Sequence, residues 1–268
     1  MLNPDPASTL ATAPAHAGSR RPGWHSVSST REYERCPRRY WYGYVARIPT
    51  DRHVPPSWRI GTAVHAALEA AYRHRQTHPT GALSCGLPAA LVALRGSWDT
   101  LELPHDDAYR RAGQMVERTL QGDVLAADRV LGVEVPLRAE LTPGHLAVGF
   151  ADLILERDDT MLEIVDHKVT SRRVSRAELA GDLQLNLYGA LALTRWPDTT
   201  VVRATHHYPT GPEAVSVTLT RAGMATARTR ILTTAAVAMA DEVYEPTPGP
   251  ACDHCPWQPR CPAGTPGR

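Results

Sequence analysis

The spacing of apolar residues predicts helices in the first half of the chain. From Ile60 to about Arg75, the apolar residues Val64, Leu68 and Tyr72 recur every four positions, which predicts a helix with one apolar stripe. The pattern stays mostly helical over residues 76–130, interrupted by Gly- and Pro-containing breaks. We therefore expect a helical insertion at about 76–130.

The apolar period then changes to two, which is typical of strands. Short β-branched or alternating segments separated by turn sequences predict five strands, at residues 132–141, 145–155, 161–169, 200–209 and 214–221. The capping-box pattern from Ser175 to Glu178 predicts a helix that continues to Trp196. A long alanine-rich helix is expected from about Arg221 to Val243. This mixture of elements predicts a fold of the α/β (α+β) class.

The beginning of the chain carries a different signal. Residues 1–23 are rich in Ala, Pro and Ser and are interpreted as a disordered tail, because they lack a continuous apolar segment of the signal-peptide type. Another capping-box pattern, Ser29 to Glu32, predicts the start of a helix that breaks around Pro37. We expect residues 24–268 to form a single domain.

Three charged residues are predicted to meet on one face of two paired strands. If the turn between the second and third strands centres near residues 158–159, these strands pair antiparallel and Asp152 lies about opposite Asp166. Strand alternation places Lys168 on the same face as Asp166. Two carboxylates and one ammonium group would therefore converge.

Composition draws attention to the same place. Lys168 is the only lysine among the 29 Lys and Arg residues of the 268-residue chain. Unlike arginine, lysine carries a compact charge and can lose its proton when buried. The sole lysine follows His167, so the Gly-Lys-[Ser/Thr] of a Walker A loop is missing and an ATP-driven motor is excluded. The net charge of +1 excludes a bulk basic coat for nucleic acid, and the apolar runs are shorter than the roughly 18 residues of a membrane span. A cytoplasmic location is the default expectation.

Burying two acids and a lysine costs free energy unless these groups form ion pairs or bind a metal. A buried ion triad and a solvated strand edge are the alternatives to a metal site. Carboxylate oxygens from Asp152 and Asp166 suit Mg²⁺ or Mn²⁺, which keep water ligands and accept a phosphate oxygen. Such a metal lowers the pKa of a bound water, and Lys168 could orient or deprotonate that water. The chemistry favours phosphodiester hydrolysis.

The order of these residues along the chain resembles the motif order of the PD-(D/E)XK nuclease superfamily. Within that superfamily, the pattern is most similar to the RecB-type branch, which includes the CRISPR-adaptation nucleases. The resemblance rests on these features: His65 in a Gly-x-x-x-His pattern, Asp152 after a glycine, Asp166-x-Lys168, and Gln184-x-x-x-Tyr188. It implies a restriction-endonuclease-like core, with a central mixed β-sheet flanked by helices. It also implies that His65 and the carbonyl of His167 are metal ligands, and that Gln184 and Tyr188 contact DNA or position the Lys168 region.

The cysteines extend this resemblance to both ends of the chain. One cysteine near the start and three at 252–261 are similar to the set that binds a [4Fe-4S] cluster in the RecB-type branch: Cys36, Cys252, Cys255 and Cys261. Four thiolates suit either zinc or an iron-sulfur cluster, and zinc remains the alternative. In either case the metal centre would join the N- and C-terminal segments.

The expected function is that of a metal-dependent deoxyribonuclease acting on single-stranded DNA or DNA ends. It would serve DNA repair and recombination or CRISPR spacer acquisition, with DNA as substrate and with a helicase or CRISPR integrase chain as a potential partner. The alternative is a catalytically silent DNA-binding or scaffolding protein that keeps the fold and the metal cluster.

Overall fold

The computed structural model describes residues 23–50, 55–122, 129–211 and 213–264. The chain divides into two compact units. Unit 1 draws on Met1–Arg52, Glu140–Leu146 and Thr229–Arg268, and unit 2 on His53–Ala139 and Ala147–Arg228. Of the tail expected at 1–23, residues 1–22 lie outside the described residues. The single domain expected at 24–268 remains a prediction.

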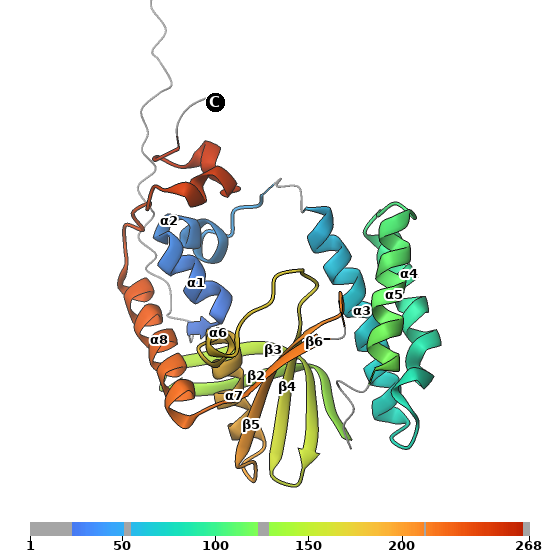
Figure 1. Ribbon diagram of the computed structural model, residues 1–268. Helices are drawn as coiled ribbons and strands as arrows, with labels where there is room; N and C mark the ends of the chain where they lie inside the picture. Colours follow the sequence, from blue (N-terminus) through green and yellow to red (C-terminus); the bar gives the residue numbers. More distant parts are fainter. Residues whose placement is uncertain (1–22, 51–54, 123–128, 212, 265–268) are drawn as a thin grey trace, which may run out of the picture. The chain divides into compact units, whose positions relative to one another are not determined.

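Unit 2 contains a helical layer made of α3 (Pro56–Thr77), α4 (Leu87–Thr100) and α5 (Asp107–Gln121), with a short 3₁₀ turn η2 (Leu83–Gly86) before α4. The three helices lie side by side (Figure 1). The predicted stripe of α3 is buried: Val64, Leu68 and Tyr72 are each at most 1% exposed. They share one apolar core with strand residues such as Leu153 and Val165, so this core fixes α3 against the sheet.

The sheet is mixed, as predicted. Its successive strands are β2 (Arg129–Thr142), β3 (His145–Asp158), β4 (Met161–His167), β5 (Val201–Tyr208) and β6 (Glu213–Thr218). β3 pairs antiparallel with β4, β4 runs parallel to β5, and β5 pairs antiparallel with β6. β2 also pairs with β3. The parallel pair β4–β5 arises where the chain crosses over between these two strands.

The strand register places the two predicted acids opposite each other. Leu153 pairs with Val165, so Asp152 lies one position beyond this pair, facing Asp166. The expected antiparallel pairing is therefore correct, but the turn lies at residues 159–160, since Asp158 pairs with Met161, and a register shift between Glu156 and Asp158 brings Asp152 opposite Asp166.

Two short helices occupy the crossover where the sequence predicted one. The Ser175 capping box is present and begins α6 (Arg176–Ala180). This helix ends at Gly181, and Asp182 then caps a new helix, α7 (Leu183–Arg195), by accepting a hydrogen bond from the N–H of Leu185. The prediction of one continuous helix was wrong because a glycine followed by an N-cap aspartate stops one helix and starts the next. α7 contacts β4 and β5.

Unit 1 brings together segments that are far apart in the sequence. It contains β1 (Gly23–His25), α1 (Val27–Arg35), α2 (Pro37–Tyr40) and the π-helical turn η1 (Trp41–Val45), followed much later by the second half of α8 (Arg221–Ala240) and the 3₁₀ turns η3 (Pro250–His254) and η4 (Gln258–Arg260). Glu34 of α1 accepts hydrogen bonds of 2.8 and 2.6 Å from the Arg230 guanidinium of α8. The Tyr42 hydroxyl donates to the Arg260 carbonyl at 2.8 Å.

The helix start predicted at Ser29 is shifted by three residues. Ser26 is the N-cap of α1, and its side chain forms a capping box with Ser29. Ser26 can take this role because it is extended (φ −129°) and its hydroxyl reaches the Ser29 N–H. The break around Pro37 is confirmed, since α1 ends at Arg35 and Pro37 begins α2. Among the helices that the structure describes, none is long and apolar enough to cross a membrane.

Candidate active site

The ends of β3 and β4 bring the two acids and the lysine together. Asp152 Oδ2 accepts a hydrogen bond of 2.8 Å from the His167 N–H, and Lys168 Nζ lies 2.5 Å from Asp166 Oδ2. Burial, followed by the charge of Asp166, raises the pKa of Asp152 to about 7. Two carboxylates crowded in a poorly solvated place are stabilised by any cation that binds between them. Strand alternation alone predicted this convergence.

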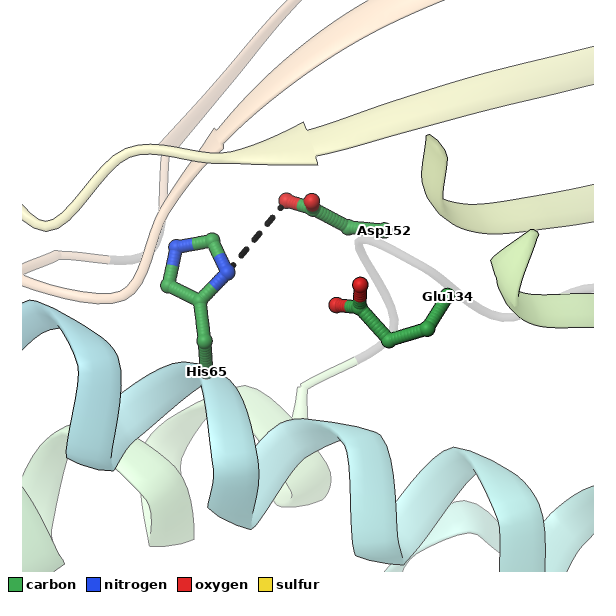
Figure 2. A group of neighbouring side chains, drawn as sticks. All are labelled: His65, Glu134 and Asp152. Carbon is green, nitrogen blue, oxygen red and sulfur yellow. Dashed lines mark ion pairs between the residues drawn. The ribbon is translucent and has the colours of Figure 1, made fainter. Parts of the chain in front are cut away.

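His65 reaches the same place from α3. Its Nε2 lies 2.9 Å from the carbonyl oxygen of His167, and its Nδ1 lies 3.5 Å from Asp152 Oδ2. The ring projects from the helix toward the strand that carries Asp152 (Figure 2). His65 is adjacent to Val64 in the sequence, so it stands at the margin of the buried stripe and is directed at the strand ends.

Glu134 of β2 is a member of the site that the sequence analysis missed. Single ligand atoms of His65, Glu134 and Asp152 all lie within 4.8 Å of one another (Figure 2). Burial and the nearby charges of Asp152 and Glu69 raise the pKa of Glu134. The available signal was an acid between two apolar β-branched residues, Val133 and Val135.

The backbone of Glu134 is strained. Its φ of +49° lies in the left-handed region, which non-glycine residues adopt at a cost of about 1 to 3 kcal/mol. Val133 and Val135 on either side are both buried. The unusual conformation occurs at the residue whose carboxylate lies beside His65 and Asp152.

Gln184 and Tyr188 lie one turn apart on α7, as their spacing predicted. Gln184 Nε2 donates to Asp166 Oδ1 at 3.1 Å, and the Tyr188 hydroxyl accepts a hydrogen bond of 3.3 Å from the Phe150 N–H. A side chain at Gly149 would collide with the Tyr188 ring, so the glycine of the Gly-x-x-Asp pattern allows this ring to approach β3. Burial raises the pKa of Tyr188 to about 12, which keeps its hydroxyl protonated at neutral pH.

Two further histidines, His206 and His167, lie on the paired strands β5 and β4. His206 is paired with Asp166 across the parallel strands, and its Nε2 lies 3.4 Å from Asp166 Oδ2. Desolvation is the main cause that lowers the pKa of His206, and it also lowers the pKa of the buried His167 well below the usual range. These rings are therefore neutral near pH 7, so the cationic group in contact with Asp166 is Lys168.

The donor set fits a divalent metal ion. It offers carboxylate oxygens from Asp152, Asp166 and Glu134, the His65 imidazole and the His167 carbonyl. Oxygen donors with one imidazole suit hard or borderline ions such as Mg²⁺ and Mn²⁺. Burial and, after it, the nearby charge of Asp166 raise the pKa of Asp152, and a bound cation would favour its ionised form.

Four of the five cysteines gather in unit 1. Cys36, Cys252, Cys255 and Cys261 all line one cavity, together with Arg38, Arg39 and Tyr42. None of the cysteines forms a disulfide, and the fifth, Cys85, is exposed on η2. Burial raises the pKa of the Cys255 thiol. The structure thus brings the four predicted cysteines together from both ends of the sequence.

Comparisons with known proteins identify the family and support the fold. A family model described as the PD-(D/E)XK nuclease superfamily matches residues 25–262. A crystal structure of a candidate exonuclease from Eubacterium rectale is similar, with a TM-score of 0.54, 11% identity and 92% of each chain covered. At that identity the likeness concerns the fold. The structure named SSO0001 matches with a TM-score of 0.33 and 14% identity, over 80% of this chain and 98% of that one. A search of curated proteins found no match.

Proposed function

The chain belongs to the PD-(D/E)XK nuclease superfamily, and we propose that it is an active deoxyribonuclease that uses Mg²⁺ or Mn²⁺ and degrades single-stranded DNA or DNA ends. The observation that carries the proposal is the contact between Lys168 and Asp166 beside Asp152 and His65, because acids and a lysine in contact form a complete hydrolytic set. A protein that only bound DNA would gain nothing from its single lysine at this position.

In this proposal each residue has a distinct task. Asp152, Asp166, Glu134 and His65 would hold the metal ion, with the His167 carbonyl as a further ligand. When bound, the ion supplies charge neutralisation at the scissile phosphate and acidifies a water ligand. Lys168 orients the attacking water or accepts its proton.

Two residues of α7 support the set. Gln184 fixes the orientation of Asp166 through Oδ1, which leaves Oδ2 for Lys168 and the metal. Tyr188 holds the backbone of β3 near Asp152 through its hydrogen bond with Phe150. Either side chain could also contact the DNA.

We further propose that the four cysteines of unit 1 bind a [4Fe-4S] cluster, as in the RecB-type branch. The four cysteines line one cavity, and their order along the chain, one near the start and three close together at the end, differs from the two close pairs that are usual in a zinc ribbon. Zinc is the alternative that metal analysis would detect.

The biological setting proposed for the enzyme is DNA repair and recombination or CRISPR spacer acquisition in the cytoplasm. Free cysteines that converge without forming disulfides suit a reducing compartment. A helicase or a CRISPR integrase is the partner that such a nuclease would need, because the sequence lacks a Walker A motor of its own.

The decisive test compares Lys168→Arg with Lys168→Ala in the full chain. Labelled single-stranded and duplex DNA are incubated with Mn²⁺, and the products are resolved by size. Because arginine keeps the charge but does not take up a proton from water, both variants should lose cleavage by about 10²-fold or more. Only Lys168→Arg should keep the DNA affinity of the wild type.

The controls separate the alternatives. Asp166→Asn should abolish cleavage, and Arg195→Lys on the far end of α7 should not change it. Wild-type activity that survives in Asp166→Asn would refute the assignment of the site. Tight DNA binding by the wild type without any cleavage, with Mg²⁺ or Mn²⁺, would favour the silent DNA-binding or scaffolding protein.

A further inference from the structure

Two large aromatic side chains of unit 2 are exposed on the elements that carry the metal-binding group, α3 and β3. Trp58 of α3 is 70% exposed and Phe150 of β3 is 57% exposed. Phe150 is also the only phenylalanine of the sequence. Burying an aromatic side chain is favourable, and an exposed ring does not gain this free energy from the fold. Two exposed aromatic rings on the elements of one site therefore indicate a ligand that covers them.

Phe150 is fixed beside Asp152 by the strand on which both lie. Burial alternates along this part of β3: Gly149, Ala151 and Leu153 are buried, whereas Phe150 is exposed and Asp152 is partly exposed. The alternation places Phe150 on the same side of the strand as Asp152, two residues away. The Tyr188 hydroxyl anchors its backbone N–H at 3.3 Å, so the ring is carried on a rigid support.

Trp58 holds a matching position relative to His65. The two residues are seven positions apart on α3, which places them on one side of the helix, about 10 Å apart along its axis. Trp58 therefore stands two turns from the metal-binding imidazole, in the first turn of α3. The exposed neighbours Ser57 and Thr62 are polar, so Trp58 does not belong to a wide apolar patch of the kind that binds a protein.

We propose that Phe150 and Trp58 stack on unpaired nucleobases of the DNA strand whose phosphate is cleaved at Asp152 and Asp166, and thereby select single-stranded over duplex DNA. The proposal rests on the nuclease function proposed above and names its substrate class. Every base offers an aromatic face, so stacking is tolerant of sequence, and bases inside a duplex already stack on each other.

Stacking adds affinity that the low net charge of the protein does not supply. DNA-binding proteins usually gain most of their nonspecific affinity from cationic side chains at phosphates. Here the net charge is only +1, and Lys168 is engaged with Asp166. Aromatic contacts supply affinity for a strand without adding positive charge.

The test measures binding, which does not require cleavage. Fluorescence anisotropy in Ca²⁺ buffer compares a labelled 12-nucleotide dT strand, the same strand made entirely of abasic sites, and a duplex of equal length. Phe150→Ala and Trp58→Ala should each weaken binding of the dT strand by about five- to hundredfold, because one stacked base contributes on that scale. Binding of the abasic strand should change less than twofold.

Matched variants show whether the aromatic face is responsible. Phe150→Tyr and Trp58→Tyr should keep most of the affinity for dT, and Val92→Ala, an exposed apolar residue of α4, should have no effect. Unchanged dT binding in both alanine variants would overturn the proposal. Equal losses for the dT and abasic strands would overturn it as well, since they would indicate a contact with the backbone.

A cleavage assay on the same variants distinguishes the two proposals. If the wild type cleaves single strands and the alanine variants lose the preference for single strands over duplex, both proposals are supported. If neither the wild type nor the variants cleave DNA, but the alanine variants still bind the dT strand more weakly and the abasic strand normally, the nuclease function fails. The stacking of Phe150 and Trp58 on bases then stands without it.

Discussion

The raised pKa of Asp152 leads to a prediction about how pH and metal control stability. The pKa rises from 3.8 to about 7 because the carboxyl is buried and lies near Asp166. Between pH 3.8 and about 7, the Asp152 carboxyl keeps its proton in the folded protein, whereas it has lost the proton in the unfolded chain. Its stabilising contribution is complete below pH 3.8 and is lost as pH rises toward 7.

The magnitude follows from the pKa shift. Between pH 5.5 and 8 the metal-free protein should lose roughly 2 kcal/mol of unfolding free energy through Asp152, since one pKa unit corresponds to about 1.4 kcal/mol. For a chain of this size that loss lowers the melting temperature by about 4 to 8 °C. The buried histidines His167 and His207 have lowered pKa values and act in the opposite direction below about pH 6.5.

The measurement is a thermal melt of the wild type and Asp152→Asn at several pH values, with EDTA and with Mn²⁺. The difference between the two proteins isolates the contribution of Asp152 from that of the histidines. Asp152→Asn should be the more stable protein above pH 7 in EDTA and should gain little from Mn²⁺. In the wild type, the gain from Mn²⁺ should grow with pH, because the ion displaces the proton. A gain that is the same at pH 5.5 and pH 8 would refute this reasoning.

Three other substitutions test separate parts of the structure. Glu134→Gly should raise the melting temperature by about 2 to 4 °C, because glycine accepts the left-handed backbone, and should weaken Mn²⁺ binding. Glu134→Gln should weaken Mn²⁺ binding without raising the melting temperature. Equal melting temperatures for the two variants would contradict backbone strain at Glu134. Gly149→Ala should cost about 1 to 3 kcal/mol in a denaturant titration, because the new methyl group collides with the Tyr188 ring; wild-type stability would show that the ring moves freely. Cys36→Ser should remove the visible absorbance of anaerobically purified protein, whereas Cys85→Ser should keep it; a colourless wild type containing zinc would refute the cluster.

The facing positions of Asp152 and Asp166 could be predicted because they depend on local rules. The turn at residues 159–160 and the register shift between Glu156 and Asp158 together fix the register of β3 and β4, and the alternation of side chains then determines which residues share a face. The helix α3 was predictable for a similar reason, since its apolar stripe is regular and entirely buried.

Glu134 could not be predicted in the same way. An alternating strand pattern assumes ordinary strand dihedrals, and the φ of +49° breaks that assumption. The conformation depends on how β2 packs near α3, which is a tertiary effect. The division into α6 and α7 was, in contrast, present in the sequence as Gly181-Asp182, but the strong helical pattern on either side obscured it.

The composition of unit 1 has a consequence for biosynthesis. α1 contacts α8 through Glu34 and Arg230, so nearly 200 residues must leave the ribosome before this hydrogen-bonded pair can form. Contacts of such long sequence separation form late, because a long loop must close first. The helices of unit 2 are close in sequence and can pack early. During translation, the surface of α1 and its aromatic neighbours would therefore stay exposed until the C-terminal segments are synthesised. An exposed apolar surface of this kind is a binding site for chaperones.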